Sequence, residues 1–256
     1  MGTSASNTGP GKGVPLVPPW VPDETTNTDE VPKAPTARFR EARRALNSFA
    51  KNGGSQSLSK GLRGYANQGL GGSNIAARRM GGAATRSGAL FNVLQNLSFP
   101  TDNNESRLDP ESLVGMSSQE AIDTIIGLVS PIDGSQDSES SQHSIASALS
   151  DLLEDSPDAD LASLSTDQIY WVLERHLAHE ISNRVELDIG GTIMDNAPSA
   201  TVAVERLEEV REYIQEAVAS VFRSRSITPM TQVEATDMAN DIIEEVFAVF
   251  EEYTEE

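Results

Sequence analysis

The sequence predicts an all-α protein, mostly a helical bundle, with a disordered or extended N-terminal tail. Apolar residues recur at helical spacing through the second half, and Ser or Thr stands three positions before Glu or Gln at several expected helix starts. Residues 1–35 are instead rich in Gly, Pro, Ser, Thr and Asn, with few large apolar groups to offset the entropy of ordering. We therefore expect an extended docking tail at 1–35, a basic Gly-rich helical region at 36–99 and an acidic helical bundle domain at 108–256.

The tail contains the stretch PLVPPW at 15–20, whose prolines favour an extended polyproline-like conformation. In that conformation the apolar side chains of Leu16, Val17 and Trp20 are exposed to solvent. Extended segments with exposed apolar anchors are typical of docking peptides. The expected partner-binding residues of the tail are Leu16, Val17, Pro18, Pro19 and Trp20.

The first residues, MGTSAS, place Gly2 directly after the initiator Met. They match the short M-G-x-x-x-S pattern of N-myristoylation, but one acyl chain binds membranes only marginally, and the first 30 residues contain no basic cluster. A small residue at position 2 also permits removal of Met1. The α-amine that remains is unhindered and, with an ordinary pKa of about 8, partly neutral and nucleophilic near neutral pH. Gly2 is therefore a candidate for modification.

The basic region begins with TARFREARRALNSFAK at 36–51, which predicts an amphipathic helix with Phe39, Leu46 and Phe49 on its apolar face. Asn52-Gly53-Gly54 should end this helix. Glycine then recurs between short helix-like pieces, as far as a short expected helix in GALFNVLQNL at 88–97. Close backbone packing, or close approach to a ligand, could explain so many glycines.

The stretch GLGGSN at 69–74 precedes IAARRM and resembles a Gly-rich loop that opens a helix. Backbone amides at such a loop could hold an anion, with help from Arg78 and Arg79. A simple turn at the start of a helix is the other interpretation, and the one we favour. We expect Arg78 and Arg79 to be exposed and to contact an acidic partner or nucleic acid.

The acidic half follows a polar linker at 100–107 and shows apolar stripes at helical spacing. Asp109-Pro110, and the pairs Ser117 with Glu120, Ser165 with Gln168 and Thr231 with Glu234, have the pattern of helix starts. The stripes are Ile122, Ile125, Ile126 and Val129; Ile145, Leu149, Leu152 and Leu153; Leu207, Val210, Ile214, Ala217 and Val221; and Met238, Ile242, Ile243, Val246, Phe247 and Phe250.

Three stretches of this half show signals other than those of a helix. VELDIGGTIMDN alternates polar and apolar residues around Gly190-Gly191, so a small β-hairpin near 185–196 is an alternative there. SPIDGSQDSESSQHS at 130–144 has the composition of a solvent loop, and RSRSITPM at 223–230 that of a turn.

Few residues have the pattern of a chemical site. The chain has no Cys, and GPGKG at 9–13 lacks the preceding strand, the Ser or Thr after the lysine and the following helix of a phosphate loop. His176, His179 and Glu180 share one helical turn, but their order is not that of zinc peptidases. We favour a core position for His176 and a solvated one for His179, and we expect no catalytic residue, metal or cofactor.

Charge divides the chain sharply. Residues 1–99 contain 12 Lys or Arg against 5 Asp or Glu, whereas residues 100–256 contain 7 against 34. Contact with nucleic acid or an acidic protein would therefore come from the first half. The sequence has no run of eighteen apolar residues and no apolar segment of a secretory signal near its start, so we expect a soluble, cytoplasmic protein.

Together these residues resemble QatB, a component of the bacterial Qat anti-phage defence system. The resemblance rests on MGTS, GPGKG and PLVPPW near the start, ARFREARRALNSF at 37–49 and GLGGSNIAARRMGGA at 69–83. It covers roughly the first 100 residues, while the acidic half matches only in general character. None of these motifs is catalytic.

The resemblance implies association with a QueC-like protein, a P-loop ATPase and a TatD-like nuclease. QueC-type chemistry uses ATP to activate a carboxylate on a deazapurine so that an amine can attack it. The tail could then present the Gly2 amine to the QueC-like active site, as an acceptor or as a regulatory plug, with PLVPPW as its anchor.

We therefore expect a non-enzymatic adaptor of an anti-phage complex, whose tail engages the QueC-like partner. The alternative is a nucleic-acid-binding subunit that acts through residues 33–99, where 11 basic residues face one acidic residue, Glu41. An enzyme is the third interpretation, and it lacks a convergent site.

Overall fold

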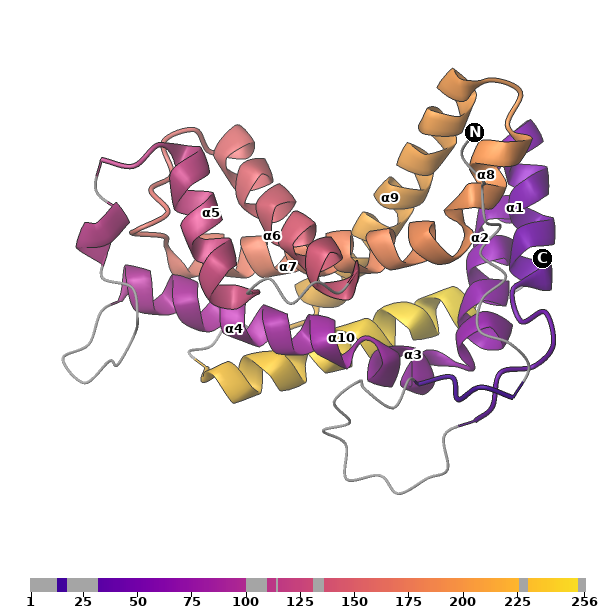
Figure 1. The fold of residues 1–256 in the computed structure, drawn as a ribbon, viewed down its shortest axis with the longest axis horizontal. Helices are drawn as coiled ribbons and strands as arrows, with labels where there is room; N and C mark the ends of the chain where they lie inside the picture. The colour runs from indigo at the N-terminus through magenta and orange to yellow at the C-terminus, as the bar shows by residue number, and fades with distance from the viewer. Residues whose placement is uncertain are drawn as a thin grey trace. The chain divides into compact units, whose positions relative to one another are not determined.

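The computed structural model describes residues 13–17, 32–99, 110–113, 115–130, 136–225 and 230–252. These residues are mostly helical and contain no strand, which confirms the all-α class. Figure 1 shows the helices in chain order. They are α1 (Arg40–Asn52), α2 (Ser55–Gly64), the π-helix η1 (Tyr65–Leu70), α3 (Ser73–Arg79), α4 (Gly81–Ser98), the 3₁₀ helix η2 (Pro110–Leu113), α5 (Ser118–Val129), α6 (Gln136–Asp155), α7 (Thr166–Val185), the π-helix η3 (Glu186–Gly190), α8 (Gly191–Asn196), α9 (Ala200–Arg223) and α10 (Gln232–Glu251).

The described residues form two compact units, each assembled from separate stretches of sequence. Unit 1 takes its residues from Met1–Gly82, Ile181–Ala217 and Asn240–Glu256, and unit 2 from Ala83–Glu180 and Val218–Ala239. This grouping differs from the expected division between 36–99 and 108–256, because part of the acidic half belongs to the same unit as the basic region.

Unit 1 has an aromatic core around Tyr65, which is fully buried. The Tyr65 ring lies 5.7 Å from the Phe39 ring and 6.3 Å from the Phe247 ring, between centroids. Phe247 in turn meets Phe250 edge-on at 5.5 Å. Such ring pairs add to the free energy gained from burial, so the predicted apolar faces of the first and last helices meet in one core.

Glycine allows α1 and α2 to lie side by side in unit 1 (Figure 1). A Cβ on Gly64 would lie 2.9 Å from the backbone nitrogen of Ala42, and one on Gly61 would lie 2.7 Å from Leu46 Cδ2. Both distances are too short for a real side chain. Close backbone packing therefore explains these two glycines of the Gly-rich region.

Unit 2 has its own core, in which Phe91 of α4 meets Tyr170 of α7 edge-on at 6.0 Å. The Ser98 hydroxyl at the end of α4 accepts a hydrogen bond from the Leu164 amide at 2.9 Å. Gly88 of α4 faces Thr236 and the carbonyl of Gln232 on α10 so closely that no Cβ fits between the two helices. Small residues at this crossing thus determine how the two helices pack.

The predicted helix starts are confirmed where the structure describes them. The Ser117 hydroxyl accepts from the Glu120 amide, and the Glu120 carboxylate accepts from the Ser117 amide at 2.8 Å, which completes a capping box and lowers the Glu120 pKa. Thr231 and Glu234 pair in the same way, as do Ser165 and Gln168. The predicted stripes are mostly buried, with Ile126, Leu153, Leu207 and Met238 half-buried.

The structure contradicts the β-hairpin alternative at 185–196 and the expected loop at 130–144. Residues 185–196 continue the helical path through η3 and α8 instead of forming a β-hairpin, because Val185, Ile189 and Ile193 recur every fourth residue and are all buried. The expected loop at 130–144 becomes helical at Gln136. The residues buried there are Ser138, Ser141 and Ser144. This face of the helix therefore packs through small polar side chains and lacks the spaced apolar residues by which a helix is recognised in a sequence.

Two helix bounds also differ from the expected ones. The first helix begins at Arg40, and the short helix expected at 88–97 extends over Gly81–Ser98.

The Gly88 crossing gives a test of unit 2. Gly88→Ala should lower the free energy of unfolding by about 1–3 kcal/mol, because its Cβ would overlap Thr236 Oγ1 and lie 2.8 Å from the Gln232 carbonyl oxygen. Gly127→Ala in α5 is the matched control: a Cβ there meets nothing within 4 Å, so alanine should stabilise by about 0.5–1 kcal/mol. Urea unfolding of both variants measures the difference. Equal stabilisation by the two would contradict this packing.

Candidate functional site

Two short extended segments of the predicted tail pair with each other on unit 1. We call residues 13–17 and 32–34 the N-terminal arms. The Leu16 amide donates to the Pro32 carbonyl at 2.9 Å, and the Ala34 amide donates to the Val14 carbonyl at 2.8 Å. Pro15 and Lys33 thereby form an isolated antiparallel bridge. The described part of the tail is extended, as predicted, and residues 18–31 connect the two arms.

The arms are held by a small apolar cluster of Leu16, Val17, Ala34 and Ile75. Leu16 and Val17 are only 2% and 5% exposed, so the expectation that they are exposed anchors was wrong. Their side chains cover unit 1 of the same chain, because Ile75 on α3 offers them an apolar surface. Val14 remains 41% exposed.

The GLGGSN turn is shaped to receive the first arm. A Cβ on Gly71 would lie 2.5 Å from Leu16 Cδ1, and the Gly71 φ of +92° belongs to the left-handed region that favours glycine. The Ser73 amide, at the start of α3, donates to the Glu251 carboxylate at 3.1 Å. The anion that this turn could hold is therefore a carboxylate of the chain itself, and the favoured interpretation as a turn that starts a helix agrees with the structure.

Arg79 fixes the first arm to α3. Its Nη1 atom donates to the Leu16 carbonyl at 2.8 Å. Burial, with a further contribution from the charge of Arg184, lowers the Arg79 pKa to about 10. Arg78 is 8% exposed and Arg79 is half-buried, so the expectation that both are exposed was wrong. Whether either residue contacts a partner stays a prediction.

The remaining predicted site residues lie outside the described residues. They are Gly2, Pro18, Pro19 and Trp20, together with most of GPGKG. Their proposed roles in modification and partner binding stay predictions.

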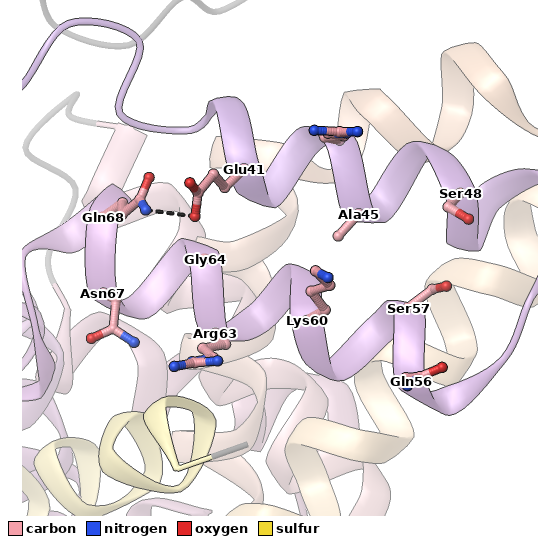
Figure 2. A pocket seen from close by; sticks show the side chains of 11 residues that line it. Glu41, Ala45, Ser48, Gln56, Ser57, Lys60, Arg63, Gly64, Asn67 and Gln68 are labelled. Carbon is pink, nitrogen blue, oxygen red and sulfur yellow. Dashed lines mark hydrogen bonds between the residues drawn. The ribbon is translucent and has the colours of Figure 1, made fainter. Parts of the chain in front are cut away.

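Unit 1 also carries a polar groove between α1 and α2, with a volume of about 890 Å³. Arg44, Lys60 and Arg63 line it, with Glu41 as the one acidic residue among the lining residues. Figure 2 shows the Lys60 side chain between the two helices, and Glu41 of α1 joined to Gln68 of η1 by a hydrogen bond of 2.5 Å. The charged side chains that line the groove are net positive, so the groove favours anionic groups.

A second group of charges lies inside unit 1, and the sequence analysis missed it. Asp188 of η3 accepts a hydrogen bond from the Tyr65 hydroxyl at 2.9 Å and another from Arg184 Nε at 3.3 Å. The charges of Arg38, Arg79 and Arg184 act on the same group of residues, and we call these three the arginine cluster. Burial raises the Tyr65 pKa well above its usual value. In the sequence Asp188 lies two residues after Glu186, in a stretch that alternates polar and apolar residues, so no local pattern marks it as a buried acid.

His176 lies in the core of unit 2, as predicted, with its side chain fully buried. Burial is the main reason that its pKa falls to about 3, and the positive charge of Arg86 lowers it further. His179 is partly exposed, and its Nε2 atom lies 2.9 Å from Asp151 Oδ2. In the part of the chain that the structure describes, no group of three His, Cys, Asp or Glu side chains is placed to hold a metal ion. Nor is any described helix long and apolar enough to cross a bilayer.

The buried His176 should make unit 2 sensitive to acid. Its folded-state pKa of about 3 lies below the ordinary value of 6.5, so the unfolded chain takes up the proton first and stability is lost as the pH falls. Between about pH 7 and pH 5 this group should cost about 2 kcal/mol. Urea unfolding over this range should show that the free energy of unfolding falls less for His176→Leu than for the parent. His143→Gln, at an exposed position of α6, should lose as much stability as the parent. If His176→Leu also loses as much stability as the parent, His176 is not the cause of the acid sensitivity.

A comparison with family models matches residues 71–250 to the family described as Qat anti-phage system associated protein QatB. The match starts inside GLGGSNIAARRMGGA and extends through the acidic half. Most of the residues that match the family therefore lie in the helices that follow the N-terminal motifs. Searches against curated proteins and against solved structures gave no match. The matched range covers well over half of the 256 residues, and the chain therefore belongs to the QatB family, whose members are associated with the Qat anti-phage system.

Proposed function

We propose that this chain is a non-enzymatic adaptor of the Qat anti-phage system, and that its N-terminal region docks onto the QueC-like component. Membership of the QatB family implies other Qat components as partners. The structural observation that supports the docking role is the fixation of the N-terminal arms on unit 1. Arg79 and the Leu16 cluster hold the first arm, and backbone hydrogen bonds hold the second arm to it.

This arrangement changes which tail residues are available to a partner. Leu16 and Val17 are occupied by contacts with their own chain. In our proposal Pro18, Pro19 and Trp20 take the role of anchors, because they directly follow the first arm. An aromatic anchor next to a fixed point loses less conformational freedom on binding than one in a free peptide.

The Gly2 amine is the proposed point of modification. Ten residues separate Gly2 from the first described residue of the arm, Gly13. At a span of at most about 3.3–3.6 Å per residue, this length lets the amine reach several tens of ångströms from the arm. A QueC-like partner anchored at Trp20 could thus receive the amine in its active site, as acceptor for an activated deazapurine or as a plug.

The proposal that the chain is not itself an enzyme is supported by the positions of Tyr65 and His176, whose pKa values are shifted by burial. Tyr65 donates to Asp188 within the core of unit 1, and His176 is enclosed by the core of unit 2. Both groups serve packing, and neither is accessible to a substrate. We place the protein in the cytoplasm, with the P-loop ATPase and the TatD-like nuclease as further proposed partners.

A second candidate function is nucleic-acid binding through residues 33–99. The groove between α1 and α2 favours it, because Arg44, Lys60 and Arg63 line it together with polar neighbours. Binding through such a groove would depend on phosphate contacts and weaken steeply with salt. Association with a QueC-like protein that withstands salt would favour the adaptor.

Trp20→Ala should abolish stable co-purification with the QueC-like partner, while unfolding of the isolated chain stays unchanged. The matched control is Phe99→Ala, which removes an aromatic ring that is 49% exposed in unit 2. Losing one central aromatic anchor typically costs about 2–4 kcal/mol of binding free energy, or roughly 30- to 1,000-fold in affinity. Equal binding by the parent and Trp20→Ala would contradict the docking proposal.

Gly2→Leu should separate docking from modification. A bulky second residue keeps Met1 in place and removes the free glycine amine, while the anchor at Trp20 stays intact. We expect the variant to co-purify with the QueC-like partner, to show no added mass by intact-mass spectrometry and to fail in phage defence. If Gly2→Leu protects cells as well as the parent does, the amine is not an acceptor and only docking remains.

A further inference from the structure

Arg38 stands out among the charged residues of unit 1 because its guanidinium is buried without a hydrogen bond. The residue is 3% exposed, and its Nε, Nη1 and Nη2 atoms have no hydrogen-bond partner. Its guanidinium lies over the Phe39 ring, whose centroid is 4.4 Å from Arg38 Cζ. A cation over an aromatic face gains some energy, but it uses none of the five N–H donors.

Arg38 lies among other charged residues of unit 1. Among the described residues that act on it electrostatically, Arg79 and Arg184 add positive charge and Asp188 adds negative charge. Asp188 accepts hydrogen bonds from Tyr65 and Arg184, and makes none with the unpaired nitrogens of Arg38. Burial lowers the pKa of both Arg38 and Arg79, as expected for cations removed from water.

The backbone around the cluster is also unusual. Ala37, directly before Arg38, has a φ of +54°, in a region that residues other than glycine seldom adopt. Tyr65 and Asp188 both lie in π-helical turns, η1 and η3, which occur frequently at functional sites. Strain of this kind persists where the surrounding structure fixes it, often at a binding site.

We propose that the arginine cluster of Arg38, Arg79 and Arg184 binds an oxyanion, and that the natural occupant is a phosphate group. Guanidinium forks bind phosphate and carboxylate oxygens in pairs, so a phosphate would use the donors of Arg38 that are now unpaired. A phosphate group carries about −1.5 to −2 charges, so it would neutralise more of the cluster's positive charge than one carboxylate would. The site is separate from the exposed groove between α1 and α2.

The test compares melting temperatures of the full chain in inorganic phosphate and in sodium chloride of equal ionic strength. If the site binds free phosphate, the parent should melt roughly 5–10 °C higher at a phosphate concentration about 100-fold above the dissociation constant. Arg38→Met should abolish this rise. Arg63→Met, which removes an exposed arginine of the groove, is the matched control and should keep it.

The proposal is overturned if phosphate does not raise the melting temperature of the parent. It is also overturned if Arg38→Met keeps the full phosphate effect, since the anion would then bind elsewhere.

Discussion

The hydrogen bond from the buried Tyr65 hydroxyl to Asp188 connects positions 123 residues apart, and unit 1 depends on it. The same tyrosine ring packs on Phe39 and on Phe247. One side chain therefore touches all three stretches of sequence from which unit 1 is assembled. Because burial keeps Tyr65 in its neutral form, the hydroxyl remains a donor over the physiological pH range.

The N-terminal arms and the arginine cluster both rest on this core. Arg79 contacts the first arm through the Leu16 carbonyl and shares the electrostatic environment of Asp188 and Arg38. A change in the charge state of the cluster would therefore act on the residue that holds the arm. This link connects the proposed docking segment to the interior of unit 1 through a single side chain, without a movement of whole helices.

Local signals in the sequence were sufficient for the class and for most helices. In the pairs Ser117–Glu120 and Thr231–Glu234 a hydroxyl residue stands three positions before a glutamate. This spacing corresponds to one capping geometry at the start of a helix, so both caps could be predicted from the sequence. The β-hairpin alternative is wrong because Val185, Ile189 and Ile193 recur at helical spacing in a stretch whose residues also alternate in polarity. The buried serines of α6 carry no apolar signal, so the sequence predicts a loop where the structure has a helix from Gln136 onward.

The candidate site was predictable only in part, for a different physical reason. The tail and Arg79 were recognised as special, but exposure cannot be deduced from an extended segment whose receiving surface, Ile75 with the opening at Gly71, lies more than fifty residues later. The arginine cluster unites Arg38, Arg79 and Arg184 with Asp188 across the whole chain. No local pattern encodes such a meeting of distant charges.

The division of unit 1 among three stretches has a consequence during synthesis on the ribosome. The residues up to Gly82 emerge early, yet the unit also needs Ile181–Ala217 and Asn240–Glu256. The residues from 83 to 239 take roughly 8–30 s to synthesise, since a ribosome adds about 5–20 residues per second. During that interval Tyr65 has no Phe247 to pack against, and the Ser73 amide lacks its Glu251 partner. A chain released before its last helix would therefore have an incomplete core in unit 1, with apolar surface exposed to proteases.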